Sequence, residues 1–406
     1  MKVLQINNVY NFGSTGKITR DIHHMLQRQG VESVVCYGRR YKTDDKNVTK
    51  ICSEVYGKAN NLLSRITGVP YGGCHLATNK LIRIIKKEKP DVVHLQCLNG
   101  FFVNIYSLIE FLKREQIPTV LTLHAEFMHT ANCGHAYDCE KWKTGCGGCP
   151  DIRKATNSYF FDRTHYSWKR MKRAFEDFDK LTVVSVSPWL MERAQNSPIL
   201  ADKRHVTIYN GLNTSVFQPC DTSALRKELG IRFDEKVVFH ATVGFSLDPN
   251  HNKGGYYIRE LAERLKCEKV RIVVAGPADS VEQLPANMML LGPVMDQQRL
   301  AQLYSMADVT LITSKRETFS MVCAESLCCG TPVVGFKAGA PEQISLSQYS
   351  SFCSYGDIEG LVMLISAKLQ SADKHRIASD SKQVFDIKHM TEKYMNLYQE
   401  MKERKV

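Results

Sequence analysis

Short runs of aliphatic and β-branched residues recur along the whole chain, and segments with helical spacing separate several of them. In the first half these runs are KVLQIN (2–7), SVVCYG (33–38), DVVHLQ (91–96), TVLTLH (119–124), LTVVSVS (181–187) and HVTIYN (205–210). In the second half they are KVVFHAT (236–242), KVRIVVAG (269–276), ADVTLIT (307–313) and TPVVGF (331–336). Continuous apolar strands that alternate with helices are typical of parallel sheets covered on both faces. The chain is therefore predicted to be α/β, with two Rossmann-like, doubly wound parallel sheets.

The length of the chain favours two domains rather than one. At 406 residues it is too long for a single typical core, and two domains of about 200 residues are expected. A connector that contains Gly, Asn and Pro, GLNTSVFQPCDTS (211–223), separates the two series of strands. We predict an N-terminal domain over residues 1–217, with a Cys-rich insertion at about 131–151, and a C-terminal domain over residues 218–388.

Composition indicates a globular protein of the cytoplasm. The chain is 43% hydrophobic and 24% charged, and it has no apolar run near the ~18–20 residues of a membrane span. The start, MKVLQINNVYNFGSTG, is typical of a strand that leads into a glycine loop rather than of a signal peptide. In that compartment the 14 cysteines are expected to be reduced or bound to metal.

Ligands of doubly wound sheets bind at the carboxyl ends of the strands. The first strand leads into NFGSTGKITRDI, where Gly13 lets the backbone approach a ligand at the start of a helix. A tight strand-to-helix turn without a ligand is the alternative for this loop.

Two glutamates stand eight positions apart in SKRETFSMVCAE (314–325), which follows a predicted strand. Ser320 is a good N-cap for a helix that runs to Cys329, and amide groups at such a helix start bind phosphate. Glu325, in the second turn, is placed to bind a ribose diol. Glu317, before the cap, is placed to bind a sugar on the other side of the phosphates. The spacing therefore predicts a nucleotide-sugar site.

The same residues carry a resemblance to a known family. The E-x7-E pattern, YNGLNTSVF (209–217), the pair Lys253-Gly254 and the closing helix MTEKYMNLYQEM resemble the retaining glycosyltransferases of family 4. The resemblance covers nearly the whole chain. It implies the GT-B fold, in which two Rossmann-like domains face a cleft and a C-terminal helix, here 389–406, packs back on the N-terminal domain.

The resemblance also implies roles for single residues. His124, Lys253 and Glu317 match the family's catalytic positions. The implied donor-binding residues are Gly13, Lys253, Glu317, Phe319, Ser320, Met321 and Glu325. Lys253 would neutralise the leaving diphosphate, and no catalytic metal is expected.

Two departures from the family pattern affect the donor site. Phe245 stands where the family usually has an arginine after V-G. Thr318 and Ser320 replace the glycines of the common E-G-F-G sequence, which makes the sugar pocket more crowded.

Four cysteines lie within a short stretch, ANCGHAYDCEKWKTGCGGCP. They are Cys133, Cys139, Cys146 and Cys149. Clustered cysteines in a reducing compartment are typical of a structural zinc site, with reduced thiols or disulfides as alternatives. Similar insertions with KWKTGC occur in family members that build bacterial exopolysaccharides and O-antigens.

Positive charge is concentrated in the first half, with +11 over residues 1–200 and +1 over the rest. RTHYSWKRMKR (163–173) combines five cations with Tyr166 and Trp168, which favours an anionic membrane surface as partner.

Taken with the resemblance, these features predict a retaining glycosyltransferase at the inner face of the cell membrane. It would transfer a sugar from a UDP- or GDP-sugar to a lipid-linked oligosaccharide, in the synthesis of O-antigen, capsule or exopolysaccharide. No nucleic-acid partner is expected. A zinc-containing nucleic-acid-binding protein and a GT-B nucleotide-sugar epimerase are the alternatives.

Overall fold

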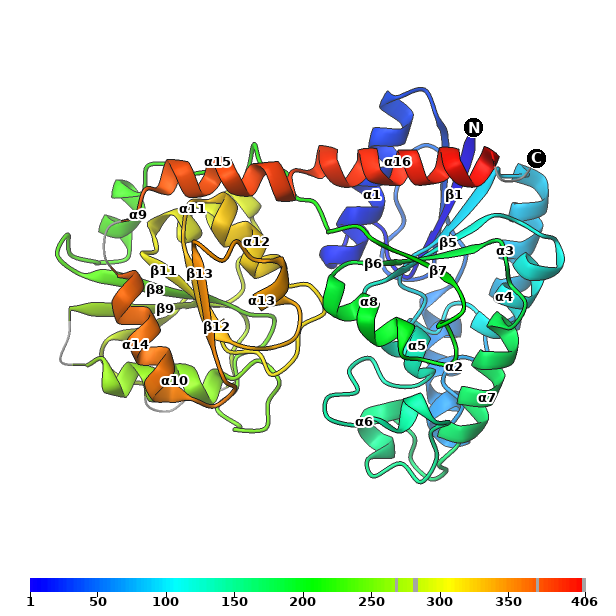
Figure 1. Cartoon of the computed structure of the whole chain (residues 1–406), viewed down its shortest axis with the longest axis horizontal. Coiled ribbons are helices and arrows are strands. Elements are labelled where there is room, and N and C mark those ends of the chain that lie inside the picture. The colour runs from blue at the N-terminus through cyan, green and yellow to red at the C-terminus, as the bar shows by residue number, and fades with distance from the viewer. Residues whose placement is uncertain (267–268, 280–283, 370–371, 404–406) are drawn as a thin grey trace. The chain divides into compact units, whose positions relative to one another are not determined.

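The structure is a computed structural model that describes residues 1–406 apart from 267–268, 280–283, 370–371 and 404–406. The chain forms two compact units (Figure 1). The N-terminal unit comprises Met1–Tyr209 and Met390–Val406, and the C-terminal unit comprises Asn210–His389. No helix of the described chain is long and apolar enough to cross a bilayer.

In the described part of the N-terminal unit, a seven-stranded sheet has the order β3-β2-β1-β4-β5-β6-β7, with all neighbours parallel. Its strands are β1 (Lys2–Asn7), β2 (Glu32–Tyr37), β3 (Val48–Lys50), β4 (Val92–Leu95), β5 (Thr119–Leu123), β6 (Leu181–Ser185) and β7 (Arg204–Thr207). Its helices are α1 (Gly13–Arg28), α2 (Glu54–Thr67), α3 (His75–Glu88), α4 (Ile105–Arg114), α5 (Phe127–Thr130), η1 (Lys141–Lys143), α6 (Ile152–Thr156), α7 (Thr164–Phe175), α8 (Pro188–Gln195) and most of α16 (Ile387–Glu403).

The described residues of the C-terminal unit form a six-stranded parallel sheet in the order β10-β9-β8-β11-β12-β13. Its strands are β8 (Lys236–Ala241), β9 (Val270–Ala275), β10 (Met288–Leu290), β11 (Val309–Ile312), β12 (Val333–Phe336) and β13 (Ser350–Cys353). Its helices are α9 (Ser223–Glu228), α10 (Gly255–Arg264), α11 (Gln297–Met306), α12 (Met321–Cys328), α13 (Pro341–Ile344), α14 (Ile358–Lys368) and α15 (Lys374–Phe385).

All of the apolar runs read from the sequence form strands, so the predicted pair of parallel doubly wound sheets is confirmed. Three short strands were not predicted: β3, β10 and β13. Each lies at an edge of its sheet and is only partly buried, so it lacks the long apolar run of a central strand.

The predicted return of the C-terminal helix to the N-terminal unit is also confirmed (Figure 1, red). The Tyr398 hydroxyl lies 2.7 Å from Nδ1 of His94 on β4, and Nε2 of His94 lies 2.7 Å from Oγ1 of Thr122 on β5. The Tyr394 hydroxyl lies 2.9 Å from the same Thr122 oxygen. Burial lowers the pKa of His94 to about 3, so this histidine stays neutral. The buried hydrogen bonds fix α16 on the sheet.

Tyr398→Phe is expected to lower the free energy of unfolding by about 1–3 kcal/mol, because it removes a hydrogen-bond partner of the buried His94 ring. Urea unfolding can be followed by tryptophan fluorescence, since Trp142, Trp168 and Trp189 all lie in this unit. Tyr41→Phe is the matched control, because the Tyr41 side chain is 83% exposed. Equal losses in the two variants would contradict the anchoring role of Tyr398.

Candidate active site

Three loops of the C-terminal unit meet at the carboxyl edge of its sheet. They follow β8, β11 and β12, in which β11 pairs with both of the others. Lys253 lies in the first loop, Glu317 in the second and Gly339 in the third. Because ligands of doubly wound sheets bind at this edge, the predicted residues lie where a ligand site is expected.

Lys253 and Glu317 form an ion pair, with Nζ 2.6 Å from Oε1. The two side chains are 25% and 19% exposed, so both remain within reach of a ligand. The backbone of Glu317 is held by the third loop, since its N–H donates to Ala338 and its carbonyl accepts from Ala340. A carboxylate and an ammonium group are thus fixed side by side at the sheet edge.

Gly254, which follows Lys253, allows this close approach of loops. Its φ is +64°, and a Cβ atom at this position would lie 2.3 Å from the carbonyl oxygen of Thr313. Thr313 also donates from Oγ1 to the carbonyl of Lys253 at 2.9 Å. Any larger residue would push the Lys253 loop away from the β11 loop.

Ser320 caps α12, as predicted, with its Oγ accepting from the Cys323 amide at 3.3 Å. Its φ of +82° is in the left-handed region, where a non-glycine residue is strained. This is the position at which the family commonly has glycine. Phe319 packs its buried ring on Phe385, so only its backbone is suited to contact a ligand. The backbone around Met321 opens α12, where the helix dipole favours an anion.

Glu325 lies in the second turn of α12 and is held by a tyrosine. The buried Tyr304 hydroxyl, on α11, donates to Oε2 of Glu325 at 3.0 Å. Burial raises the pKa of Tyr304, so the hydroxyl keeps its proton and remains a donor. The carboxylate is therefore oriented before any ligand binds.

Phe245 brings no cation to this edge. Its side chain is buried in the core of the C-terminal unit, and its N–H donates to the Pro277 carbonyl. Residue 245 therefore contributes to packing.

His240, near the end of β8, was not among the site residues predicted from the sequence. Nδ1 of His240 lies 2.9 Å from the Leu311 carbonyl, which can only accept, so Nδ1 carries the proton. Burial lowers the pKa of His240 to about 4, with smaller effects from Lys253 and Glu317. Nε2 is buried without a hydrogen-bond partner among the described residues. The sequence could have indicated His240, because it lies near the carboxyl end of the predicted strand KVVFHAT, where ligands of such sheets bind.

Two predicted residues lie in the N-terminal unit. His124 follows β5, and its Nε2 lies 3.1 Å from Oε1 of Gln96. Burial lowers the pKa of His124 to about 4, so the ring is neutral near pH 7. Gly13 is the first residue of α1 and has a φ of +61°. The structure thus brings Lys253, Glu317 and the α12 residues together in one unit and leaves His124 and Gly13 in the other.

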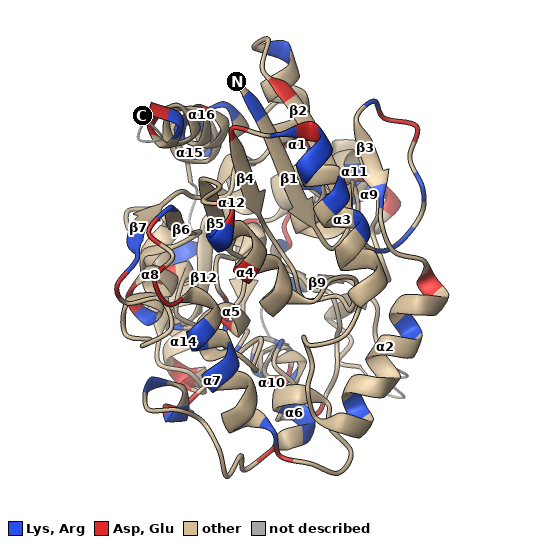
Figure 2. Cartoon of the chain, turned by 90° about the vertical axis from the view of Figure 1, so that its right-hand side faces the viewer, with Lys and Arg blue, Asp and Glu red and all other residues tan. Residues whose placement is uncertain are grey.

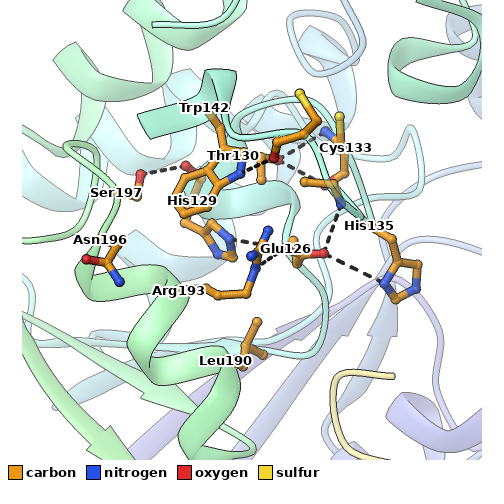
Figure 3. A network of polar contacts seen from close by, with 12 residues as sticks. Glu126, His129, Thr130, Cys133, His135, Trp142, Leu190, Arg193, Asn196 and Ser197 are labelled. Atoms are coloured by element: carbon orange, nitrogen blue, oxygen red, sulfur yellow. Dashed lines mark hydrogen bonds and ion pairs between the residues drawn. The ribbon is translucent and has the colours of Figure 1, made fainter. Parts of the chain in front are cut away.

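A buried ionic network lies two residues after His124 (Figure 3). Oε1 of the fully buried Glu126 is 2.5 Å from Nε of Arg193 on α8 and 3.6 Å from Nε2 of His129. Oε2 accepts from the Ala136 amide at 2.9 Å and lies 4.0 Å from Nδ1 of His135. This network, which sequence analysis missed, ties the Cys-rich loop to α8.

The charge of Glu126 is maintained despite its burial. Burial alone would raise the pKa of this carboxyl group, but contacts with His129, the charge of Arg193 and the Ala136 amide outweigh it and lower the pKa to about 2. The Arg193 guanidinium also packs on the rings of Trp142 and Trp189, 4.9 and 5.0 Å from their centroids.

The predicted zinc site is not supported. Cys133, Cys139, Cys146 and Cys149 are free, partly buried thiols. Across the residues that the structure describes, no group of three or more His, Cys, Asp or Glu side chains could hold a metal ion. The residues do not fit the ion, and hydrogen bonds such as those of Glu126 order the loop instead.

Two family models match most of the chain. The model described as Glycosyltransferase Family 4 matches residues 15–216, and the model described as Glycosyl transferases group 1 matches residues 238–370. A putative colanic acid biosynthesis glycosyl transferase, WcaC of Escherichia coli (strain K12), is 22% identical over 99% of this chain and 100% of its own.

Solved structures share the fold. Sucrose-phosphate synthase from Thermosynechococcus elongatus has a TM-score of 0.68 at 14% identity and covers 99% of both chains. The Anabaena protein Alr3699/HepE, solved in complex with UDP and glucose, has a TM-score of 0.64 at 18% identity, over 98% of this chain and 99% of its own.

Glu126→Gln is expected to lower the free energy of unfolding at neutral pH by about 3–5 kcal/mol, because it leaves the Arg193 charge without its buried partner. Glu140→Gln is the control, since the exposed pair of Glu140 with Lys143 is worth less than about 1 kcal/mol. Urea unfolding measures both, and equal stability of Glu126→Gln and the wild type would contradict the assigned role.

The pH dependence of stability should change in the same variant. The folded-state pKa of Glu126, about 2, is below its ordinary value of 4.5, so its ionised form stabilises the fold above pH 4.5. This contribution is lost as the pH falls from 4.5 towards 2. Wild-type stability should therefore fall more steeply over this window than that of Glu126→Gln. If the stability of both proteins changes equally with pH between 4.5 and 2, then Glu126 is not ionised in the folded protein.

Proposed function

The chain belongs to glycosyltransferase family 4 and has the GT-B fold, and from this premise we propose that it transfers a sugar with retention from a nucleotide-diphosphate sugar to a lipid-linked acceptor. The observation that carries the donor assignment is the ion pair of Lys253 with Glu317, held beside the start of α12. A cation, a helix N-terminus and two carboxylates on one side of a sheet edge match the chemistry of a sugar diphosphate.

Each donor-binding residue takes one part of the donor. The ammonium of Lys253 and the backbone at Phe319, Ser320 and Met321 bind the diphosphate. Glu317 accepts hydrogen bonds from the sugar hydroxyls. Glu325, oriented by Tyr304, accepts from the ribose diol. UDP or GDP is the proposed nucleotide, and the Anabaena relative's complex with UDP and glucose supports a donor of this class.

In the proposed reaction the bond between the anomeric carbon and the phosphate oxygen breaks, and its electron pair leaves with the diphosphate. The acceptor hydroxyl forms the new bond on the same face of the sugar, and its proton passes to the departing phosphate oxygen. Charge grows on the diphosphate in the transition state, so Lys253 and the α12 amides stabilise that state more than the ground state.

The N-terminal unit is proposed to contribute Gly13 and His124. The neutral imidazole of His124, held by Gln96, suits hydrogen bonding to a sugar hydroxyl rather than charge neutralisation. The backbone at Gly13 is open to a ligand, since no atom beyond its chain neighbours and the backbone of its own helix lies within 4 Å of the position that a Cβ would take.

We propose a lipid-linked oligosaccharide as acceptor, in the synthesis of a bacterial surface polysaccharide at the inner face of the cell membrane. The colanic acid relative supports the pathway class, and the +11 charge of residues 1–200 supports an anionic membrane as partner.

The proposal is tested by a thermal-shift screen of nucleotide sugars, followed by product analysis with the stabilising donor. A donor that raises Tm and yields a retained glycosidic product supports it. If no nucleotide sugar binds, or if the product is inverted, the proposed reaction is wrong.

Glu325→Gln is expected to raise the KM for the donor roughly ten- to a hundred-fold, because a charge-assisted hydrogen bond of about 1.5–3 kcal/mol is lost. The amide oxygen can still accept from Tyr304, so folding should be kept. Lys253→Ala should lower kcat by about a hundred-fold or more, because leaving-group stabilisation is lost in the transition state.

Lys227→Ala serves as the control, since Lys227 is an exposed lysine of the same unit that lies on α9, outside the three loops of the site. Steady-state kinetics with the confirmed donor distinguishes the effects on KM and kcat. Wild-type kinetics for both Glu325→Gln and Lys253→Ala would place the donor site elsewhere.

A further inference from the structure

Helix α2 turns its apolar side outwards. The residues that it buries are Gly57 and Ser64. Its exposed large apolar side chains are Val55, Leu62, Leu63 and Ile66, which follow one another at helical spacing, and Val55 is 79% exposed. A surface helix of a globular protein normally has the opposite orientation, because burial of apolar side chains stabilises the fold.

A segment far away in the sequence extends this apolar face. The amide of Tyr159 donates to the Arg65 carbonyl at 2.8 Å, and the Arg65 side chain donates to the Tyr159 hydroxyl at 3.1 Å. The next two residues, Phe160 and Phe161, are exposed, and Phe160 is 68% exposed. On the other side, the Tyr56 hydroxyl accepts from the amide of the exposed Leu76.

These side chains form what we call the α2 surface, which consists of Val55, Leu62, Leu63, Ile66, Leu76, Tyr159, Phe160 and Phe161. It holds more than half of the large exposed apolar side chains in the described chain. Scattered apolar side chains are common on protein surfaces, but such a concentration marks an interaction site.

Positive charge borders the α2 surface. Figure 2 shows lysines and arginines on α2, α6 and α7. Lys58 and Arg163 are exposed. Lys58 lies on α2 itself, and the Arg163 guanidinium lies 6.0 Å from the Phe161 ring centroid. The nearby acids already have partners, since Glu54 pairs with Arg39 and Lys50 and Asp162 accepts from the Cys149 and Thr164 amides. The surface thus offers apolar groups and cations together.

We propose that the α2 surface docks on an anionic lipid bilayer, with its aromatic and aliphatic side chains at the acyl boundary and its cations at the headgroups. A bilayer presents apolar material beneath a layer of negative charge, which complements both features. A second copy of this chain would place the like charges of two such surfaces together. The inference rests on the proposed function, whose membrane partner it assigns to a particular surface.

The structure also corrects the expectation that Trp168 contacts the membrane. Its side chain is buried, and Nε1 donates to the Trp142 carbonyl at 2.8 Å. The apolar contact therefore comes from α2 and the Tyr159–Phe161 segment. Arg163, whose guanidinium lies 6.0 Å from the Phe161 ring centroid, supplies charge beside it.

The test is co-sedimentation of the full chain with vesicles of phosphatidylcholine and phosphatidylglycerol at low and high salt. The variant Leu62→Gln/Leu63→Gln/Phe160→Ser/Phe161→Ser is expected to lower partitioning about ten-fold or more at both salt concentrations. The matched control is Phe233→Ser in the C-terminal unit, since Phe233 is 100% exposed and lies outside the surface. A charge variant, Lys58→Gln/Arg163→Gln, should lose mainly the salt-sensitive part of binding.

Transfer to a water-soluble acceptor is measured in parallel and is expected to be unchanged in all of these variants. If the wild type ignores the vesicles while transfer persists, the docking inference is wrong and the proposed reaction remains. If the wild type self-associates and the four-residue variant is monomeric, a second copy covers the surface, and the lipid assignment is overturned. Equal binding of the wild type and the four-residue variant would also overturn it.

Discussion

A chain can pair two strands in parallel only by crossing back over the sheet, and this requirement shapes both units. Most crossovers in these sheets carry helices, so the central strands are buried on both faces and are apolar along their length. The same geometry gathers the carboxyl ends of all strands at one edge. The loops after β8, β11 and β12 therefore meet although long stretches of chain separate them. The ion pair of Lys253 with Glu317 depends on this arrangement.

The candidate site also depends on loops whose backbones lie unusually close together at the edge of this sheet. Gly254 lets the Lys253 loop touch Thr313, and Ser320 holds a left-handed backbone conformation immediately before α12. A strained non-glycine residue persists only where its surroundings hold it, as the Cys323 amide and the buried Phe319 do here. The groups proposed to bind the donor are thus held in place by the fold itself, which reduces the cost of ordering them on binding.

The N-terminal unit buries a charged side chain and exposes several large apolar ones, which is the reverse of the usual distribution. Glu126 is fully buried and is tolerated because Arg193 and the Ala136 amide satisfy it. On α2, by contrast, leucines are exposed while glycine and serine are buried. Both features are unfavourable for an isolated fold unless a partner or a network compensates. For Glu126 the network is internal, whereas for α2 we propose that an anionic bilayer covers the exposed leucines.

Sequence alone determined the central strands, the two-sheet organisation and the helix that Ser320 caps, because apolar runs and capping residues are local signals. It also singled out Glu317 and Glu325 through their spacing, and Lys253 through the resemblance to the family. It missed the edge strands β3, β10 and β13, which lack an apolar run, and it missed Glu126 and His240, whose partners lie elsewhere in the fold. The spacing of the cysteines suggested a zinc site that the folded loop does not form. Only the tertiary structure decided that the apolar side chains of α2 are exposed and that Trp168 is buried. Periodicity shows that a helix has an apolar face, but it does not show what packs on that face.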